Sequence, residues 1–306
     1  MTTEPQWIEI AGSGVTLKAL TWGFDQGGPE RPIALCLHGF PDTAYGWRKI
    51  APQLVAAGYR VVAPMMRGYA PSGFPVDGSY HVGALMDDAL RARDAAGPTD
   101  GDLLIGHDWG AIAATGLSAM PDSPFRKAVI MSVPPSASFQ PPGRIAHPGR
   151  LAAEVPRQLL RSWYIMYFQL PWLPEHSAQW VVPRLWRQWS PGYDATEDVQ
   201  HVFTAIGAPA HWRAALGPYR ATVRNSAPPQ RFAGLHQHWL SAPQLPVLYL
   251  HGGDDGCATA AYTDWVRPIL PVGSRAEIVA GAGHFLQLEQ PERVGRLIVD
   301  FASAAD

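Results

Sequence analysis

The chain has 306 residues, a formal net charge of -2 at pH 7 and 47% hydrophobic residues. This length suffices for one large domain with an insertion. The small net charge gives no electrostatic reason to expect nucleic acid or an anionic membrane as a partner. The start, MTTEPQWIEI, lacks the features of a signal peptide, and we find no apolar stretch long enough to span a membrane. We therefore expect a cytoplasmic protein.

The two cysteines, Cys36 and Cys257, cannot form a disulfide framework. Each lies in an apolar or glycine-rich segment, so we expect buried, reduced thiols. The sequence contains no Cys/His metal spacing and no phosphate loop of the GxxxxGK type. Neither a metal nor an organic cofactor is therefore expected.

The first elements predicted along the chain are a β-hairpin and then buried strands alternating with helices. WIEI and VTLKALTW alternate in polarity around the turn Gly12-Ser13-Gly14. Short apolar runs predict strands at Ile33–Leu37, Tyr59–Ala63, Asp102–Ile105, Lys127–Met131 and Pro246–Leu250. Helical spacing predicts helices at Ala44–Ala57, Tyr80–Ala95, Ala111–Met120, Thr259–Ile269 and Pro291–Ala304. This alternation predicts an α/β fold with a mostly parallel, doubly wound sheet.

The alternation stops between about Val133 and Ala242, where tryptophan, tyrosine and arginine are dense. We interpret this stretch as a helical insertion that packs over the sheet. The predicted division is a core at 1–133, a helical cap at 134–242 and the rest of the core at 243–306. The alternative is a continuation of the sheet whose strands are hard to recognise.

A strand–turn–helix junction places Asp108 at the centre of a glycine-rich turn. The predicted strand DLLI runs into GHDWG, and the small-residue helix AIAATGLSAM follows. This context is typical of a nucleophile elbow. A carboxylate there needs no deprotonation at neutral pH and can displace a leaving group at a saturated carbon, which forms an alkyl ester. The alternative is that Asp108 only caps the helix.

A histidine and an acid late in the chain suit the hydrolysis of such an ester. His284, in GAGHFLQLEQPERV, precedes the last predicted helix and can activate a water molecule. The acid that orients it should follow a late strand, and PVLYLHGGDDGC offers Asp254 and Asp255. We favour Asp255, because the Gly-x-x-Asp spacing from Gly252 carries the chain around the turn first. Asp254 is the alternative.

The motifs HGFP, RGYAPSG, GHDWG, YFQLP, HGGDDG and GHF, in this order, resemble the epoxide hydrolase branch of the α/β-hydrolase superfamily. The resemblance covers nearly the whole chain and implies an α/β-hydrolase fold with a helical cap. It implies a catalytic triad of Asp108, Asp255 and His284. It also implies that the backbone N–H groups of Phe40 and Trp109 form the oxyanion hole.

The same resemblance assigns two tyrosines of the cap to the epoxide oxygen. Tyr164 matches the first position of Y-x-x-Y-F-Q, and Tyr219 matches a Y-R motif. Their hydroxyls would hold and protonate the oxygen as the ring opens. The alternatives are that both tyrosines only pack the cap, or that Tyr167 takes the place of Tyr164. The predicted pocket wall consists of His38, Trp109, Trp163 and Phe168.

The predicted reaction is the opening of a small, hydrophobic epoxide to a diol by a monomer or homodimer. Haloalkane dehalogenases share the GHDWG motif and provide the alternative reaction. That reaction would need halide donors, such as Trp109 with Trp163 or Trp172. Phe40 stands where such enzymes often carry an asparagine, which favours the epoxide hydrolase interpretation.

Overall fold

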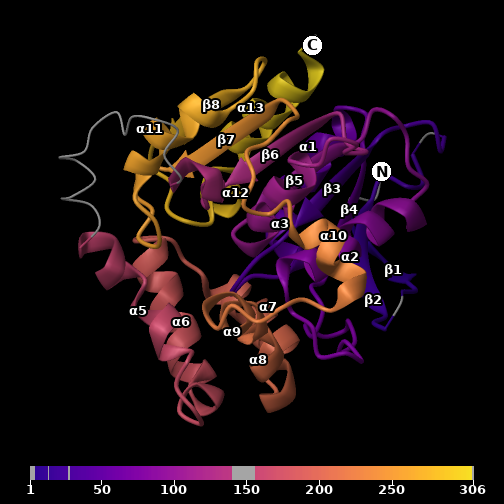
Figure 1. Ribbon diagram of the computed structural model, residues 1–306. Coiled ribbons are helices and arrows are strands. Elements are labelled where there is room, and N and C mark those ends of the chain that lie inside the picture. The colour runs from indigo at the N-terminus through magenta and orange to yellow at the C-terminus, as the bar shows by residue number, and fades with distance from the viewer. Residues whose placement is uncertain (1–3, 13, 27, 140–155, 305–306) are drawn as a thin grey trace.

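The computed structural model describes residues 4–12, 14–26, 28–139 and 156–304, and its centre is an eight-stranded sheet (Figure 1). The strand order is β1-β2-β4-β3-β5-β6-β7-β8. The strands are β1 (Gln6–Ile10), β2 (Leu17–Trp22), β3 (Ile33–Leu37), β4 (Arg60–Pro64), β5 (Leu103–His107), β6 (Lys127–Met131), β7 (Val247–Gly252) and β8 (Arg275–Val279). The strand β2 pairs antiparallel with β1 and β4, and every pair from β4 to β8 is parallel. The predicted hairpin and parallel sheet are therefore confirmed, although Ser13 of the predicted turn lies outside the described residues.

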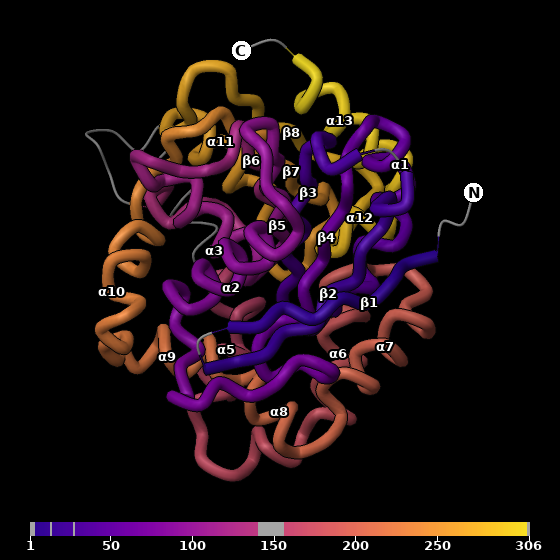
Figure 2. Tube along the Cα trace, turned by 90° about the vertical axis from the view of Figure 1, so that its right-hand side faces the viewer, coloured from indigo at the N-terminus to yellow at the C-terminus, as the bar shows by residue number. Residues whose placement is uncertain are grey.

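Helices cover both faces of the sheet, as a doubly wound fold requires. Figure 2 shows α1, α12 and α13 on one side of the sheet, and α2, α3 and α10 on the other. Because both faces are covered, the strands β3, β4, β5, β6 and β7 are buried along their whole length. The core helices are η1 (Ala44–Trp47), α1 (Ala51–Ala56), α2 (Val82–Ala95), α3 (Trp109–Ser118), η4 (Ala260–Tyr262), α11 (Thr263–Val266), η5 (Arg267–Ile269), α12 (Leu286–Glu289) and α13 (Pro291–Ser303).

Three core segments differ from the prediction. The segment predicted as one helix from Ala44 is divided into η1 and α1, with Pro52 in the first turn of α1, where its missing N–H costs nothing. The segment predicted as a helix from Thr259 forms three short pieces, η4, α11 and η5. The strand β8 was not predicted, because an edge strand with arginine and glutamate lacks the continuous apolar run of a buried strand.

Between β6 and β7 the described residues form helices and no strand, which rules out a continued sheet for them. Residues 140–155 of the predicted cap lie outside the described residues. Figure 1 shows α5 to α9 together beyond one end of the sheet, whereas α10 returns to pack on α2. The elements are η2 (Ser136–Phe139), α5 (Trp163–Tyr167), η3 (Pro174–His176), α6 (Ala178–Trp189), α7 (Thr196–Ile206), α8 (Pro209–Ala215), α9 (Gly217–Val223) and α10 (Gln230–His236).

Two expectations drawn from composition can be compared with the described chain. Both cysteines are buried and free of disulfides, as predicted. Among the described residues, no helix combines the length and the apolar character needed to cross a membrane.

Candidate active site

The turn between β5 and α3 presents Asp108 in a strained backbone conformation. Its φ of 53° and ψ of -117° fall where residues other than glycine are rare. The flanking glycines make the turn possible, because side chains there would collide with main chain. A Cβ on Gly106 would lie 2.3 Å from the carbonyl oxygen of Gly110, and one on Gly110 would lie 2.1 Å from that of Leu37. The geometry is that of a nucleophile elbow.

The Asp108 carboxylate does not cap α3, contrary to the alternative interpretation of the sequence. Its Oδ1 instead accepts a hydrogen bond of 2.7 Å from the backbone N–H of Phe40. The backbone N–H of Trp109 lies close by. A Cβ built on Gly39 would be 2.2 Å from Oδ1 and 2.6 Å from the Trp109 nitrogen. A side chain at position 39 would therefore collide with both the carboxylate and the Trp109 nitrogen, so glycine lets this loop lie directly against the elbow, where an oxyanion hole would form.

His284 lies between two carboxylates that come from distant parts of the chain. Its Nδ1 is 3.0 Å from Oδ2 of Asp255, and its Nε2 is 3.8 Å from Oδ2 of Asp108. All three side chains are buried. Nε2 has no hydrogen-bond partner among the described residues, so it is available to a water molecule near Asp108.

The loop after β7 distinguishes between the two candidate acids. Asp255 is 4% exposed, and its Oδ1 accepts hydrogen bonds from the backbone N–H groups of Cys257 and Ala258. These bonds leave Oδ2 facing the imidazole. Asp254 is exposed. The structure therefore brings Asp255, and not Asp254, to His284.

The two carboxylates control the charge of the imidazole. Burial alone would lower the pKa of His284, but the charges of Asp255 and Asp108 and their contacts raise it to about 10. Burial would raise the pKa of Asp255, but His284 holds it below the ordinary value. In this structure the pair is therefore an imidazolium and a carboxylate at neutral pH.

The backbone of His284 is held by three residues outside the predicted site. Its carbonyl oxygen accepts hydrogen bonds from the Ser132 hydroxyl, at 2.7 Å, and from Nε2 of His107, at 2.9 Å. Its N–H donates to the carbonyl oxygen of Trp189, at the end of α6. The sequence signals for two of them are weak but present, because His107 precedes Asp108 and Ser132 follows a buried strand.

Glu289 is a second contributor that the sequence analysis missed. Its carboxylate accepts hydrogen bonds from the Ser190 hydroxyl and from the backbone N–H groups of Gly283 and Phe285, on either side of His284. These bonds join the end of α6 to the histidine loop. A glutamate five residues after His284, in a segment that precedes a helix, is the available signal.

The cap places two tyrosines against the aromatic side chains of the elbow. Tyr164 and Tyr219 are each 4% exposed, and their ring centroids are 5.7 Å apart. The ring of Tyr219 packs edge-on against Trp109 at 4.9 Å and against Phe40 at 5.3 Å. Phe168, predicted as pocket wall, packs against both tyrosines and against Phe40. The two predicted tyrosines therefore lie together beside the oxyanion-hole residues.

The tyrosine hydroxyls have few hydrogen-bond partners. The hydroxyl of Tyr219 has none among the described residues. That of Tyr164 is 3.6 Å from Sγ of Cys257. Burial, followed by nearby acidic groups including Asp108, raises the pKa of both phenols well above the usual value. Both remain protonated at neutral pH and can donate to an oxygen atom.

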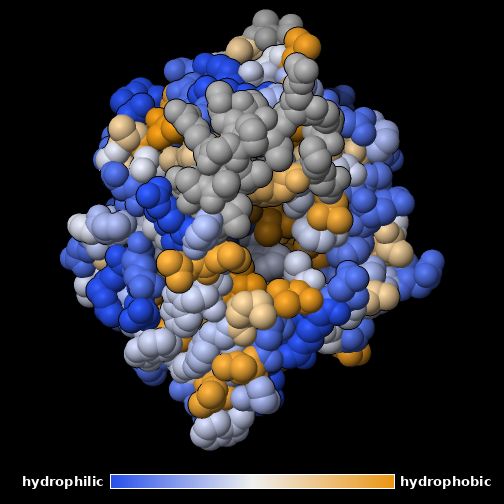
Figure 3. Space-filling view, turned by 60° about the vertical axis from the view of Figure 1, so that its left-hand side comes forward, coloured by the Kyte–Doolittle hydropathy of each residue, from blue (hydrophilic) through white to orange (hydrophobic). Residues whose placement is uncertain are grey.

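Trp163 and Tyr167 lie on a different side of α5. Trp163 packs against Trp180 at 5.6 Å and lies under the guanidinium of Arg184. The Tyr167 hydroxyl donates to the carbonyl oxygen of Leu173 in an exposed position. These contacts do not join either residue to Asp108. The space-filling view shows a hollow near the middle of one face of the molecule, with hydrophobic residues along part of its border (Figure 3).

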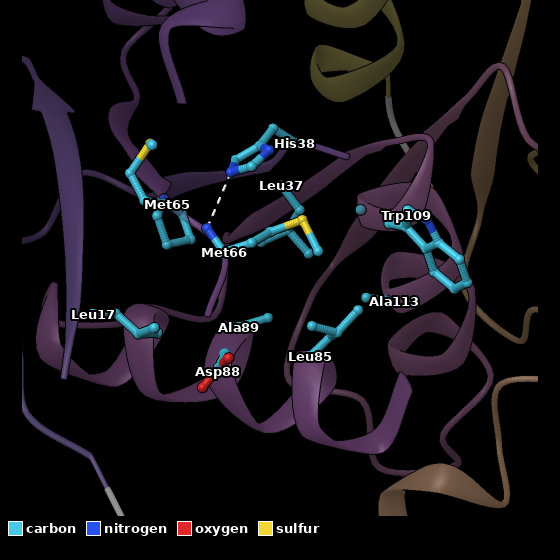
Figure 4. Close-up of a pocket in the computed structure, with 12 residues that line it drawn as sticks. Leu17, Leu37, His38, Met65, Met66, Leu85, Asp88, Ala89, Trp109 and Ala113 are labelled. Atoms are coloured by element: carbon cyan, nitrogen blue, oxygen red, sulfur yellow. Dashed lines mark hydrogen bonds between the residues drawn. The ribbon is translucent and has the colours of Figure 1, made fainter. Parts of the chain in front are cut away.

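Both ring nitrogens of His38 have partners within the protein. Its Nδ1 is 2.9 Å from the carbonyl oxygen of Gly39, and its Nε2 accepts from the Met66 N–H at 3.0 Å (Figure 4). Burial lowers the pKa of His38 to about 4, so the ring is neutral. It borders a cavity of about 30 Å³ beside α2 and α3, which has room for a few water molecules.

Comparison with known proteins is consistent with this geometry. A sequence model of the alpha/beta hydrolase fold family matches residues 32–291. The chain is 29% identical to the AB hydrolase superfamily protein YfhM of Bacillus subtilis, over 94% of this chain and 95% of that protein. It is 26% identical to epoxide hydrolase A of Mycobacterium tuberculosis, over 96% of each chain. The crystal structure of epoxide hydrolase A from Mycobacterium thermoresistibile superposes with a TM-score of 0.67 at 25% identity, covering 97% of this chain and 98% of that one. The chain belongs to the alpha/beta hydrolase fold family.

Proposed function

We propose that this protein is an epoxide hydrolase that forms an alkyl ester on Asp108. The observation that carries the proposal is the position of the Asp108 carboxylate. It lies 3.8 Å from an imidazole that contacts Asp255, and the two cap tyrosines lie together beside the neighbouring rings of Trp109 and Phe40. A nucleophile, a base and two acids for an oxygen leaving group thus converge on one buried position. The relatives named epoxide hydrolases support the same reaction.

In the first step, Asp108 attacks one carbon of the epoxide and the carbon–oxygen bond breaks. Tyr164 and Tyr219 donate hydrogen bonds to the departing oxygen, and one of them supplies its proton. Because both hydroxyls lack strong partners in the protein, they lose little when they turn to the substrate. The product of this step is a hydroxyalkyl ester.

In the second step, water attacks the carbonyl carbon of the ester. Esterification removes the negative charge of Asp108, which is one of the two charges that hold the pKa of His284 at about 10. The imidazolium therefore becomes more acidic and gives a proton to the tyrosinate left by the first step, and the neutral His284 then accepts a proton from the attacking water. The N–H groups of Phe40 and Trp109 stabilise the oxyanion. Its collapse breaks the ester C–O bond, His284 protonates the diol oxygen that leaves, and the acid proton of Asp108 passes to His284.

The substrate is a small, hydrophobic epoxide, since aromatic rings surround the carboxylate. A cytoplasmic location and the division into a core (1–133 and 243–306) and a cap (134–242) belong to the same proposal. Parallel incubation with epoxides and haloalkanes, scored for diol and for halide, distinguishes epoxide hydrolysis from dehalogenation. Halide release without diol formation would contradict the proposal.

The proposed mechanism predicts that His284→Ala traps the ester. The first step needs no base, whereas we expect ester hydrolysis to slow by about 10³-fold or more. Intact-mass spectrometry after incubation with an accepted epoxide should show the protein mass plus one substrate. Asp108→Ala should show no adduct, and His176→Ala, at an exposed histidine of the cap, should turn over like the unmodified protein. A His284→Ala protein that is neither active nor esterified would contradict the mechanism.

A further inference from the structure

A thiol lies beside the histidine and acid of the proposed triad. The potential ligand atoms of Asp255, Cys257 and His284 all lie within 4.8 Å of one another. The three residues are 4%, 5% and 0% exposed, respectively. The proposed hydrolysis gives the thiol no role, and the backbone N–H of Cys257 is the part that supports Asp255.

The donor set has the composition preferred by soft divalent cations. Thiolate, imidazole and carboxylate together bind zinc and related ions, and a thiolate selects them against magnesium and calcium. With metal–ligand bonds of about 2.0–2.3 Å, the donors around a tetrahedral ion lie roughly 3.3–3.8 Å apart. The longest donor separation therefore contracts by up to about 1–1.5 Å, whereas Nδ1 of His284 and Oδ2 of Asp255, 3.0 Å apart, move slightly apart. A cation larger than zinc needs less contraction.

Two contacts show which atoms face the cluster. The His284 nitrogen beside Asp255 is Nδ1, at 3.0 Å from Oδ2, whereas Nε2 faces Asp108. The hydroxyl of Tyr164, 3.6 Å from Sγ of Cys257, faces the cluster from the cap. A fourth ligand position, for water or this hydroxyl, is thus available on the side where substrate would lie.

We infer that Asp255, Cys257 and His284 form an inhibitory site for a thiophilic divalent cation such as Zn²⁺ or Cd²⁺. Binding forms a metal–sulfur bond and a metal–nitrogen bond and releases two protons to solvent, one from the thiol and one from Nδ1 of the imidazolium, with no change in oxidation state. The cation binds Nδ1 of His284, and the neutral ring then carries its proton on Nε2. His284 can therefore no longer take a proton from water.

The consequence for catalysis rests on the proposed function, but the binding itself does not. The test therefore has a binding measurement without substrate and an activity measurement with an epoxide. Titration of the purified, reduced protein with Cd²⁺ should produce an ultraviolet thiolate-to-cadmium absorption that saturates at one equivalent, with release of protons. Diol formation should fall at least tenfold over the same titration, and EDTA should restore it.

The chain offers a matched control because it has only two cysteines. Cys257→Ala should lose the absorption band, and its remaining activity should change less than twofold with Cd²⁺. Cys36→Ala, which removes the buried thiol of β3, should behave like the unmodified protein. Thermal unfolding of each variant checks that it is folded.

The outcomes separate the two proposals. No band in the unmodified protein, or an equal band in Cys257→Ala, would overturn the metal site whatever the activity. A band that depends on Cys257, in a protein that hydrolyses no epoxide, would support the site and count against the proposed function. Inhibition that is equally strong in Cys257→Ala would show that the cation acts elsewhere, which would also overturn the inference.

Discussion

The core and the cap hold their site residues in different ways. Main-chain hydrogen bonds hold the core loops that carry Asp108, Asp255 and His284. Ring packing holds the cap residues Tyr164 and Tyr219. In the core, Asp108 and Asp255 each accept hydrogen bonds from backbone N–H groups. In the cap, the phenol oxygens have a thiol neighbour or no partner. Hydrogen bonds fix a charged group in one orientation, and ring packing leaves a hydroxyl free to turn.

This difference suits the two kinds of group in the proposed reaction. The nucleophile and base must already be in position, because their charges act on each other over less than 4 Å. The oxygen of an epoxide can enter in more than one orientation, and free hydroxyls can follow it. We therefore expect changes in the core loops to abolish the reaction and changes in the cap to reduce it.

The largest expected effect comes from the acid loop. Asp255→Asn removes the charge that orients His284, so we expect kcat to fall on the order of 10²- to 10⁴-fold. Asp254→Asn, at an exposed neighbour in the same loop, should change kcat less than about twofold. Steady-state kinetics with an accepted epoxide measures both variants. A larger effect at Asp254 than at Asp255 would make Asp254 the orienting acid.

The cap tyrosines should give the next largest effects. Tyr164→Phe and Tyr219→Phe each remove one donor to the departing oxygen, so we expect ester formation to slow about 10- to 100-fold in each. The double variant should lose more than either single variant. Rapid-quench measurement of the ester isolates this step. Tyr167→Phe is the control, and a loss there as large as at Tyr164 would move the donor role to Tyr167.

The contact between cap and core can be weakened without changing the proposed catalytic residues of the core or the tyrosines of the cap. In the core, the guanidinium of Arg48 lies 2.6 Å from the carboxylate of Asp198, which belongs to α7 of the cap. The side chain of Asp198 is only 4% exposed. We expect Arg48→Ala to lower the free energy of unfolding by about 1–3 kcal/mol, because Asp198 loses its charged partner. Urea unfolding measures the change. Arg267→Ala, from an exposed ion pair with Asp264, should cost about 0.5 kcal/mol or less.

The last prediction is a dependence of stability on pH. The pKa of His284 is about 10 in the folded protein and about 6.5 in an unfolded chain, so its protonated form favours folding. This contribution is complete below pH 6.5 and is lost as the pH rises through 10. The difference in unfolding free energy between the unmodified protein and His284→Gln should therefore shrink from pH 6 to pH 10. A difference that is constant or grows would contradict this assignment of charge.

The sequence by itself determined the features that depend on local pattern. The strands Ile33–Leu37 and Lys127–Met131 have the predicted ends, because continuous apolar runs admit few structures other than buried strands. The elbow at Asp108 was predictable for a related reason. Asp108 follows a buried strand and has a glycine two residues away on each side. This pattern indicates a turn too tight for side chains at the glycine positions.

Only the tertiary structure decided which distant groups meet. It brought Asp255 rather than Asp254 to His284, turned Trp163 toward Trp180, and placed Cys257 beside Tyr164, 93 residues away along the chain. It also gave Glu289 its three hydrogen bonds around the histidine loop. Such contacts depend on how a loop turns or a helix rotates against its neighbours. The packing of the whole core sets these angles, and the local sequence pattern does not encode them.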